Sequence, residues 1–364
     1  MKYSFERKPM SMKKFMIIAL SFFVLVTAVV GMVLLTYVQG FLSQPGSLPA
    51  RELEILVPPN VSFAEMSRQL ESERVITDAR RFTMLAEWRK VTGKLRSGRY
   101  LVNTGWTPGQ VLDQLINGQP ILDRVTLPEG LTWWQVGRRL DEARMVRFED
   151  FEKVVHDPDF LRHHGIPRDS AEGYLFPDTY FIMRPLVLNE ESARSVAGRL
   201  IDNFWRKAAI LYPAGVKLTW DDRRHLASIV TLASIVEKET SVPGERATVA
   251  GVYANRLRRG MILQADPTII YGIGPSFDGK IKRSDLQNAN NPYNTYKHKG
   301  LPPGPICSPG LACLRAAMNP ATHNFVYFVA RGDGSHQFSE TLEGHNRAVK
   351  LYRAAMREKE QQAE

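Results

Sequence analysis

The stretch DDRRHLASIVTLASIVEKE, residues 221–239, contains the clearest periodic pattern in the sequence. Aspartates open it, where the helix dipole favours acidic side chains, and apolar residues then recur every three or four positions. This pattern predicts a long helix that buries much of its surface. The helix ends in two glutamates, Glu237 and Glu239, so two carboxyl groups lie at the end of a largely apolar element.

Each glutamate ends its own stripe along this helix. The first stripe consists of Leu226, Val230, Ala233 and Glu237; the second, nearly opposite, consists of Ser228, Leu232, Ile235 and Glu239. A carboxyl group that continues an apolar stripe is partly desolvated, which raises its pKa and keeps a proton available near neutral pH. A general acid for glycosidic bond cleavage needs such a group. Periodicity does not choose between the two glutamates, and a solvated turn that forms surface ion pairs around Lys238 is the alternative.

Three later segments carry polar side chains suited to binding sugars. LQADPTIIYG, residues 263–272, places Gln264, Asp266 and Thr268 beside an apolar run that resembles a strand. NPYNTYKHKGLPPGPICSPG, residues 291–310, mixes amides, hydroxyls and aromatic rings with proline and glycine. Its candidate contacts are Tyr293, Asn294, Thr295 and Tyr296, although a rigid connecting loop would have the same composition. GDGSHQF, residues 332–338, brings His336 to the start of a strand, where a capped structural histidine is the alternative.

Several kinds of site are disfavoured by what the sequence lacks. It has no HExxH, no G-x-S-x-G, no P-loop and no GxGxxG after a strand. The adjacent His163 and His164 have no carboxylate at helical spacing to complete a metal site. We therefore expect neither a metal nor an organic cofactor. The two cysteines, Cys307 and Cys313, could form one disulfide or remain as buried thiols.

Residues 15–38 form an uncharged apolar run. As a helix they would be about 36 Å long, enough to cross a hydrocarbon core of about 30 Å. The run is longer than the core of a cleaved signal peptide. Basic residues precede it and no charge follows until Arg51, so we expect residues 1–14 to be a cytoplasmic tail and the rest of the chain to lie outside the cytoplasm.

Composition agrees with a folded, exported protein. The chain has 364 residues, 44% hydrophobic and 24% charged, which is typical of a globular protein of about two domains. Its net charge of +10 includes five basic side chains and one acid in the first 14 residues, and no dense basic run follows. A nucleic-acid partner is therefore disfavoured.

The exported part shows two related segments. After a Gly- and Pro-containing tether at 39–51, VPPNVSFAEMSRQLESERVI (57–76) aligns with LPEGLTWWQVGRRLDEARMV (127–146) at an offset of 70. Each predicts a strand end, a turn and a capped amphipathic helix, although chance similarity between small α/β modules is the alternative. Residues 52–123 resemble a LysM-like module, the small β-α-α-β unit that binds cell-wall glycan. Its sugar contacts do not follow from spacing.

The C-terminal half alternates helices and strands, so the predicted fold class is α+β. Residues 245–260 predict a second helix with a basic last turn and a glycine stop. Residues 325–330 predict a strand, joined to HQFS (336–339) by a turn at Asp333-Gly334. A basic amphipathic helix is expected from about Glu343.

Several of these motifs together resemble the endolytic murein transglycosylase family, the MltG or YceG-like proteins. They are EGYLFPDTY (172–180), ASIVEKET (233–240), NRLRRGMILQADPTIIYG (255–272), YNTY (293–296), GLPPGPI (300–306) and GSHQF (334–338), in that order. The resemblance implies a catalytic domain at 124–360, with helix 221–239 and cleft loops at 263–310. It also implies a single-pass inner-membrane enzyme with its bulk in the periplasm and the glutamate at Glu237 as catalytic acid. By analogy with lysozyme-like transglycosylases, Gln264 and the YNTY segment would line the cleft.

The reaction that the resemblance implies is cleavage of the β-1,4 bond between N-acetylmuramic acid and N-acetylglucosamine within peptidoglycan glycan strands. Glu237 would protonate the leaving oxygen and then act as base on the muramoyl 6-hydroxyl, which gives a 1,6-anhydro end. Peptidoglycan synthases are partners that the family and the membrane tether imply. Two alternatives remain: a muramidase-type hydrolase using Glu237 and Asp266, and a non-catalytic wall-binding scaffold.

Overall fold

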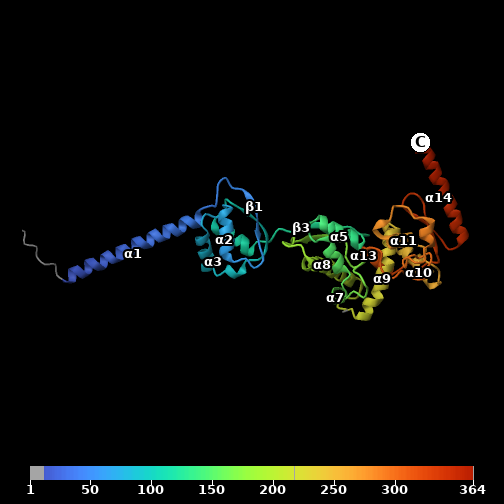
Figure 1. Cartoon of the computed structure of the whole chain (residues 1–364), viewed down its shortest axis with the longest axis horizontal. Coiled ribbons are helices and arrows are strands. Elements are labelled where there is room, and N and C mark those ends of the chain that lie inside the picture. Colours follow the sequence, from blue (N-terminus) through green and yellow to red (C-terminus); the bar gives the residue numbers. More distant parts are fainter. Residues whose placement is uncertain (1–11, 217, 364) are drawn as a thin grey trace, which may run out of the picture. The chain divides into compact units, whose positions relative to one another are not determined.

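The computed structural model describes residues 12–216 and 218–363, so most of the expected cytoplasmic tail, residues 1–11, lies outside the described residues. The chain divides into two compact units, the first ending at Leu122 and the second beginning at Asp123. Both contain helices and antiparallel strands, which confirms the α+β class (Figure 1).

The first unit begins with a long apolar helix. Its elements are α1 (Met12–Ser43), β1 (Glu52–Val57), α2 (Phe63–Ser72), α3 (Ala79–Trp88), β2 (Gly98–Asn103) and α4 (Pro108–Asn117). Within α1, the segment 16–43 is long and apolar enough to cross a membrane. The most apolar part of this segment contains no buried residue. The predicted tether is wrong at its start: residues 39–43 continue α1, since no glycine cap or proline ends the helix before Gln44.

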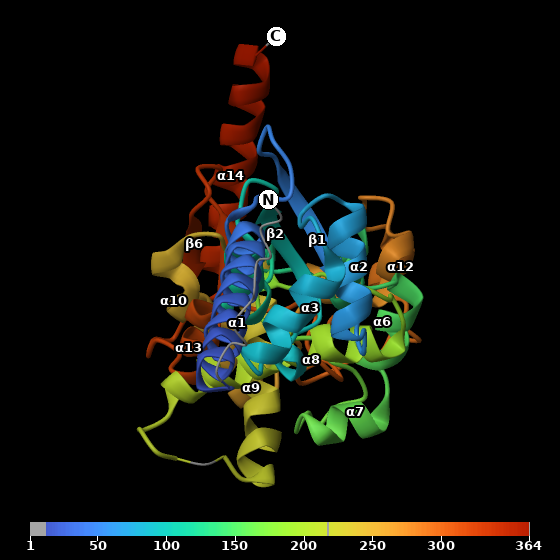
Figure 2. The ribbon, with the colours of Figure 1, turned by 90° about the vertical axis from the view of Figure 1, so that its left-hand side faces the viewer.

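The rest of the first unit is a small β-α-α-β module followed by α4. β1 and β2 pair antiparallel (Figure 2), with Ile55 opposite Tyr100. Both side chains are fully buried. Ser62 and Glu65 form a capping box that fixes the start of α2. A groove of about 410 Å³ lies between the loop after β1 (58–61) and residues 95–97 before β2. The order of elements is that of the expected β-α-α-β unit, whose LysM-like identity and glycan binding stay predictions.

The second unit is larger and mostly helical. Its first elements are β3 (Asp123–Leu127), α5 (Trp133–Glu142), α6 (Phe148–Val155), α7 (Pro158–His163), β4 (Asp178–Ile182), α8 (Glu190–Ala208) and α9 (Trp220–Glu239). The remaining elements are α10 (Arg246–Arg258), α11 (Asp266–Ile273), α12 (Arg283–Gln287), α13 (Leu311–Met318), β5 (Tyr327–Ala330), β6 (His336–Ser339) and α14 (Leu342–Ala363). The predicted helices near 221–239 and 245–260, the hairpin and the C-terminal helix are confirmed.

One predicted element has the wrong type. The apolar run after Gln264 resembles a strand in sequence, but residues 266–273 form helix α11. Pro267 stands in the first turn, where its missing N–H costs nothing, and the Thr268 hydroxyl donates to the carbonyl of Ala265 at 2.7 Å. These local features favour a helix over a strand.

The two segments related by an offset of 70 have the same local structure. β3, α5, α6 and β4 repeat the strand, helix, helix, strand order of β1, α2, α3 and β2, with one further short helix, α7. Left-handed residues occur at matching positions: Asn60 (φ 59°) with Gly130 (φ 79°), and Arg74 (φ 59°) with Arg144 (φ 56°). Chance similarity does not explain this match, which supports a repeated module.

Helix α9 runs through the core of the second unit. Thr219 and Asp222 form a capping box at its start, and its turns from Val230 to Val236 are buried on every side. The buried residues of α9 are Leu226, Ala227, Val230, Thr231, Leu232, Ala233, Ser234, Ile235 and Val236. It packs against α13 and α10. The last turn of α9 is thereby held by two neighbouring helices, which fixes where its glutamates lie.

Candidate functional site

The two glutamates at the end of α9 lie in different surroundings. Glu239 lines a pocket of about 360 Å³ together with Tyr253, Arg256, Leu263, Gln264, Asp266, Tyr296, Phe328 and His345. Tyr253, on the adjacent helix α10, donates its hydroxyl to Oε1 of Glu239 at 2.8 Å. The carboxyl group of Glu239 is therefore both oriented by a neighbour and open to a cavity.

Burial sets the protonation of Glu239. Desolvation by the surrounding protein raises its pKa from 4.5 to about 7; the hydrogen bond from Tyr253 opposes this rise, and the nearby charge of Asp266 adds to it. A carboxyl group with this pKa is substantially protonated near neutral pH. Glu239 can therefore donate a proton to a ligand in the pocket and accept one afterwards.

The opposite wall of the pocket comes from the turn before α11. The backbone of Gln264 adopts a left-handed conformation with φ of 52°, which is uncommon for a residue other than glycine. The backbone N–H of Gln264 donates to the carbonyl of Thr295 at 3.1 Å, and Arg256 donates to the carbonyl of Leu263 at 2.6 Å. Such strain is held by these contacts and is typical of functional sites.

Asp266 and Tyr296 form a pair at the pocket. The Tyr296 hydroxyl donates to Oδ1 of Asp266 at 2.6 Å, and both side chains line the cavity. Together with Gln264 they are the predicted binding residues that the structure brings to Glu239. A carboxylate, a phenol and an amide around a protonated acid can together form hydrogen bonds with the hydroxyl and acetamido groups of a sugar.

Thr268 and Thr295 support this wall from inside. Both are almost fully buried, and their hydroxyl oxygens lie 2.9 Å apart. The Thr295 hydroxyl also accepts from the amide of Ala265 at 3.0 Å. These two predicted residues therefore hold the Gln264 turn in place and do not reach the cavity.

The first half of the YNTY segment also has a structural position. Asn294 is fully buried and its side-chain amide donates to the carbonyls of Asp285, Leu286 and Asn288, at 2.8 Å for Asn288. Tyr293 packs its ring 4.7 Å from that of Tyr271, outside the pocket lining. Neither side chain lines the pocket.

His336 lies behind the pocket. Its Nδ1 is 2.7 Å from a carboxylate oxygen of Glu245, whose other oxygen accepts from the His336 amide at 2.9 Å. The ring packs edge-on to Phe328, which lines the cavity. The structure thus gives His336 the capped structural position that the sequence left open as its alternative.

Glu237 is directed to another part of the unit. Its Oε2 accepts from the amide of Gly310 at 2.9 Å, and Gly310 is the N-cap of α13. The carboxylate therefore lies at the N-terminus of a helix, where the helix dipole stabilises negative charge. The structure does not bring Glu237 together with Gln264, Asp266 or Tyr296.

Five pocket residues were not singled out from the sequence: Tyr253, Arg256, Leu263, Phe328 and His345. Tyr253 and Arg256 are three residues apart and therefore share one face of α10. That spacing was a usable signal, because a buried tyrosine and arginine on one helical face need polar partners. Phe328 and His345 lie on β5 and α14, and only the tertiary fold brings them near.

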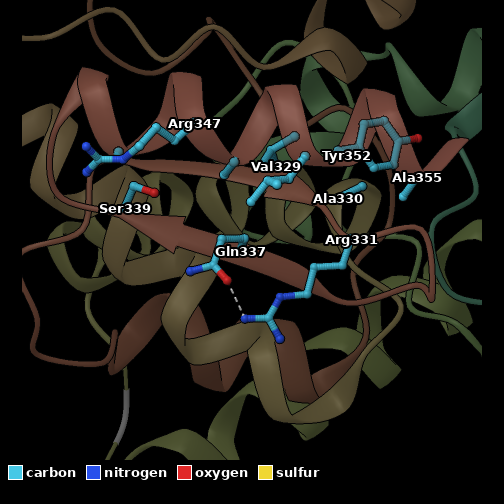
Figure 3. A pocket seen from close by; sticks show the side chains of 11 residues that line it. Val329, Ala330, Arg331, Gln337, Ser339, Arg347, Tyr352 and Ala355 are labelled. Atoms are coloured by element: carbon cyan, nitrogen blue, oxygen red, sulfur yellow. Dashed lines mark hydrogen bonds between the residues drawn. The ribbon is translucent and has the colours of Figure 1, made fainter. Parts of the chain in front are cut away.

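A second groove, of about 460 Å³, lies between β5, β6 and α14. Arg331 and Gln337 form a hydrogen bond at its floor, and Arg347 and Tyr352 line it from α14 (Figure 3). No carboxyl group lines it among the described residues, unlike the pocket around Glu239.

Neither a metal-binding cluster nor a disulfide occurs in the part of the chain that the structure describes. There, no three His, Cys, Asp or Glu side chains are grouped so as to hold a metal ion. Cys307 and Cys313 are both buried and free, which corresponds to the thiol alternative.

Comparisons with known proteins agree on one family. The family model described as the YceG-like family matches residues 55–351. The endolytic murein transglycosylase of Bacillus subtilis is 27% identical over 84% of this chain and 86% of that protein. The protein of the same name from Streptococcus pneumoniae strain R6 is 28% identical over 80% of this chain, which spans 57% of that longer protein. A crystal structure of a YceG-like protein from Listeria monocytogenes, 27% identical, matches 81% of this chain and 98% of its own with a TM-score of 0.53.

Proposed function

Because the chain belongs to the YceG-like family, we propose that it is a lytic transglycosylase that cleaves peptidoglycan glycan strands internally. The relatives named endolytic murein transglycosylase support the reaction class. The pocket around Glu239 supports it independently, because it combines a protonated carboxyl group with polar groups suited to sugar binding.

Glu239 is the proposed catalytic acid, in place of Glu237. The observation that carries this choice is the Glu239 carboxyl group, which opens onto the pocket with its pKa raised to about 7. Glu237, by contrast, is engaged with the helix N-terminus at Gly310. The proposed catalytic acid is therefore two residues further along the same helix than Glu237, the glutamate that the family resemblance implied.

The proposed reaction uses one carboxyl group twice. Glu239 protonates the leaving oxygen of the bond between N-acetylmuramic acid and N-acetylglucosamine. The resulting carboxylate then takes the proton of the muramoyl 6-hydroxyl, which attacks C1 of its own ring and forms the 1,6-anhydro end. Attack from within the ring replaces a captured water, so no second catalytic carboxylate is required. Gln264, Tyr296 and Arg256 are the proposed contacts to the sugars.

Membrane attachment through α1 completes the proposal. The single apolar helix of the described residues is consistent with an anchor. With basic residues before it, the N-terminal tail would be cytoplasmic and the two units would face the cell wall. Such a tether keeps the enzyme beside newly made glycan, where peptidoglycan synthases are the expected partners.

A muramidase-type hydrolase is the second candidate, because Asp266 lies in the same pocket as Glu239. In that reaction a second carboxylate would activate water or form a covalent intermediate. The products differ, since hydrolysis leaves a reducing end and the transglycosylase leaves an anhydro end.

The test is product analysis with matched variants. The full chain in detergent is incubated with peptidoglycan, and the fragments are identified by mass spectrometry for wild type, Glu239→Gln and Glu237→Gln. Internal fragments with 1,6-anhydro ends, lost only in Glu239→Gln, support the proposal. Loss only in Glu237→Gln would restore the sequence-based choice, reducing ends would indicate the hydrolase, and glycan binding without any product would indicate the wall-binding scaffold.

A further inference from the structure

The end of α1 is built into the module that follows it. Phe41 is only 4% exposed and belongs to the same hydrophobic cluster as Phe82 and Leu85 of α3. The guanidinium of Arg81 lies over the ring of Tyr37, 3.8 Å from its centroid, and donates to the Tyr37 hydroxyl. The last turns of α1 and helix α3 are thus held side by side within the first unit (Figure 1).

The length of α1 sets the level at which this contact lies. A hydrocarbon core of about 30 Å takes up about 20 helical residues, so a span that begins near Phe15 ends near Leu35. The headgroup layer adds about 5–8 Å, which covers the next four or five residues. Tyr37 and Phe41 therefore fall at or just above the headgroups, and α3 beside them is at the same level.

The outer face of α3 has the side chains of an interfacial helix. Met84 is 65% exposed and Trp88 is 80% exposed, although both are large and apolar. They are four residues apart and so share one face of the helix with Arg80. These three side chains, with Arg81, Leu85 and residues of α1, border a groove of about 610 Å³.

We infer that α3 rests on the surface of the bilayer that α1 crosses, with Met84 and Trp88 inserted at headgroup level and Arg80 directed to the phosphates. Tryptophan favours this region because its ring is apolar while its N–H can bond to water or headgroups. Arg80 forms no ion pair among the described residues, so its charge is available to anionic lipid. The inference rests on α1 crossing the membrane, as the proposed function requires, but not on catalysis.

The test places a fluorescent probe at single introduced cysteines of the full chain in lipid nanodiscs. The native Cys307 and Cys313 are buried, so exposed cysteines react first. Met84→Cys reports on the proposed contact, and Leu25→Cys reports on the middle of α1. Leu56→Cys is the matched control: Leu56 is also apolar and 40% exposed, but it lies on β1 and does not border the groove between α1 and α3.

Nitroxide lipids then locate each probe. We expect a nitroxide near the lipid carbonyls to remove most of the Met84→Cys fluorescence, and one near the chain ends to affect Leu25→Cys instead. The Leu56→Cys probe should keep its fluorescence with both lipids. Adding Trp88→Ser and Arg80→Glu to Met84→Cys should restore much of the lost signal.

Each other outcome overturns the inference in a distinguishable way. Quenching at Leu25→Cys without quenching at Met84→Cys would show that α1 crosses the membrane but that α3 does not rest on its surface. No quenching at Leu25→Cys would refute both the membrane-spanning α1 and the membrane-bound α3, without bearing on the activity of the pocket. A blue-shifted but unquenched Met84→Cys probe would mean that protein, such as a second copy of the chain, covers α3 instead of lipid.

Discussion

The Tyr253 hydroxyl donates to Oε1 of Glu239 at 2.8 Å, across the contact between α10 and α9. The bond orients a carboxyl group whose pKa is raised by burial, and it stabilises the ionised form. Tyr253 therefore positions the proposed acid and also limits how far its pKa rises.

The first prediction separates the two glutamates. Glu239→Gln should lower kcat by about 10²–10⁴, because general acid catalysis contributes about that much. Glu237→Gln should leave kcat within a few-fold of wild type. Release of anhydro-ended fragments from peptidoglycan measures both, with circular dichroism to confirm that each variant is folded. Equal losses in the two variants would contradict the assignment.

The second prediction concerns pH. Glu239 must be protonated to act as acid, so kcat/KM should fall as pH rises above about 7, its pKa in the folded protein. Tyr253→Phe removes a bond that favours the carboxylate, which should move this decline to higher pH. Initial rates across pH 5–9 provide the measurement, and an unmoved decline in Tyr253→Phe would show that another group controls it.

The third prediction concerns Glu172, which is 1% exposed in the loop before β4. Burial raises its pKa from 4.5 to about 8, against hydrogen bonds from the amides of Trp133 and Gly173. The folded state therefore holds a proton that the unfolded state releases above pH 4.5. The stability that this bound proton contributes is fully present below pH 4.5 and is lost as pH rises through 8. Over this range the free energy of unfolding decreases by up to about 1.4 kcal/mol per pH unit.

Urea unfolding of wild type and Glu172→Gln at pH 5, 6.5 and 8 checks this dependence. The two backbone amides of Trp133 and Gly173 donate to different oxygens of Glu172, so glutamine, with a single acceptor oxygen, can keep one of these bonds, and it has no proton to lose. The free energy of unfolding should thus decrease less with pH in the variant. Parallel curves for the two proteins would refute the assignment.

The fourth prediction concerns Glu237 as a helix cap. Glu237→Ala removes the acceptor for the Gly310 amide at the start of α13 and should lower the free energy of unfolding by about 1–2 kcal/mol. Thermal unfolding measures this loss. Unchanged stability together with lost activity would instead indicate a catalytic Glu237.

The fifth prediction uses the left-handed backbone of Gln264. Gln264→Gly removes the strain of φ 52° and should raise stability by up to about 1 kcal/mol, while Gln264→Ala should not. Both variants lose the side chain that lines the pocket and should lose activity. Denaturation and product release, measured together, separate the two effects. Full activity in either variant would exclude the side chain from substrate binding.

The sequence predicted the helix that carries the site but not which of its glutamates faces the pocket. Periodicity identifies a functional face when one side of a helix is buried and the other is exposed. Residues 230–236 of α9 are buried on all sides, so each of the two glutamates continues a stripe of buried apolar residues. Only the packing of α10 and α13 separates Glu239 from Glu237.

The same limit applies to the binding residues. Gln264, Asp266 and Tyr296 were recognisable because each lies in a short segment whose polar and aromatic side chains suit sugar binding. Phe328 and His345 arrive from elements much later in the chain, and no local pattern connects them to α9. Thr268 and Asn294 were chosen for their chemistry, but buried backbone groups take up their hydrogen bonds.

The repeated β-α-α-β module has two different uses in one chain. In the first copy, the loop with Asn60 borders an open groove. In the second copy, the amide of the matching Gly130 donates to the carbonyl of Ser308 at 2.9 Å, and the carbonyl of Gly130 accepts from Lys238 of α9 at 3.3 Å. The loop that borders an open groove in the first copy thus contacts, in the second copy, the helix that ends in Glu239. A duplicated module can therefore serve two purposes without a new fold, when one copy keeps its loop exposed and the other uses the same loop to hold the helix that ends in Glu239.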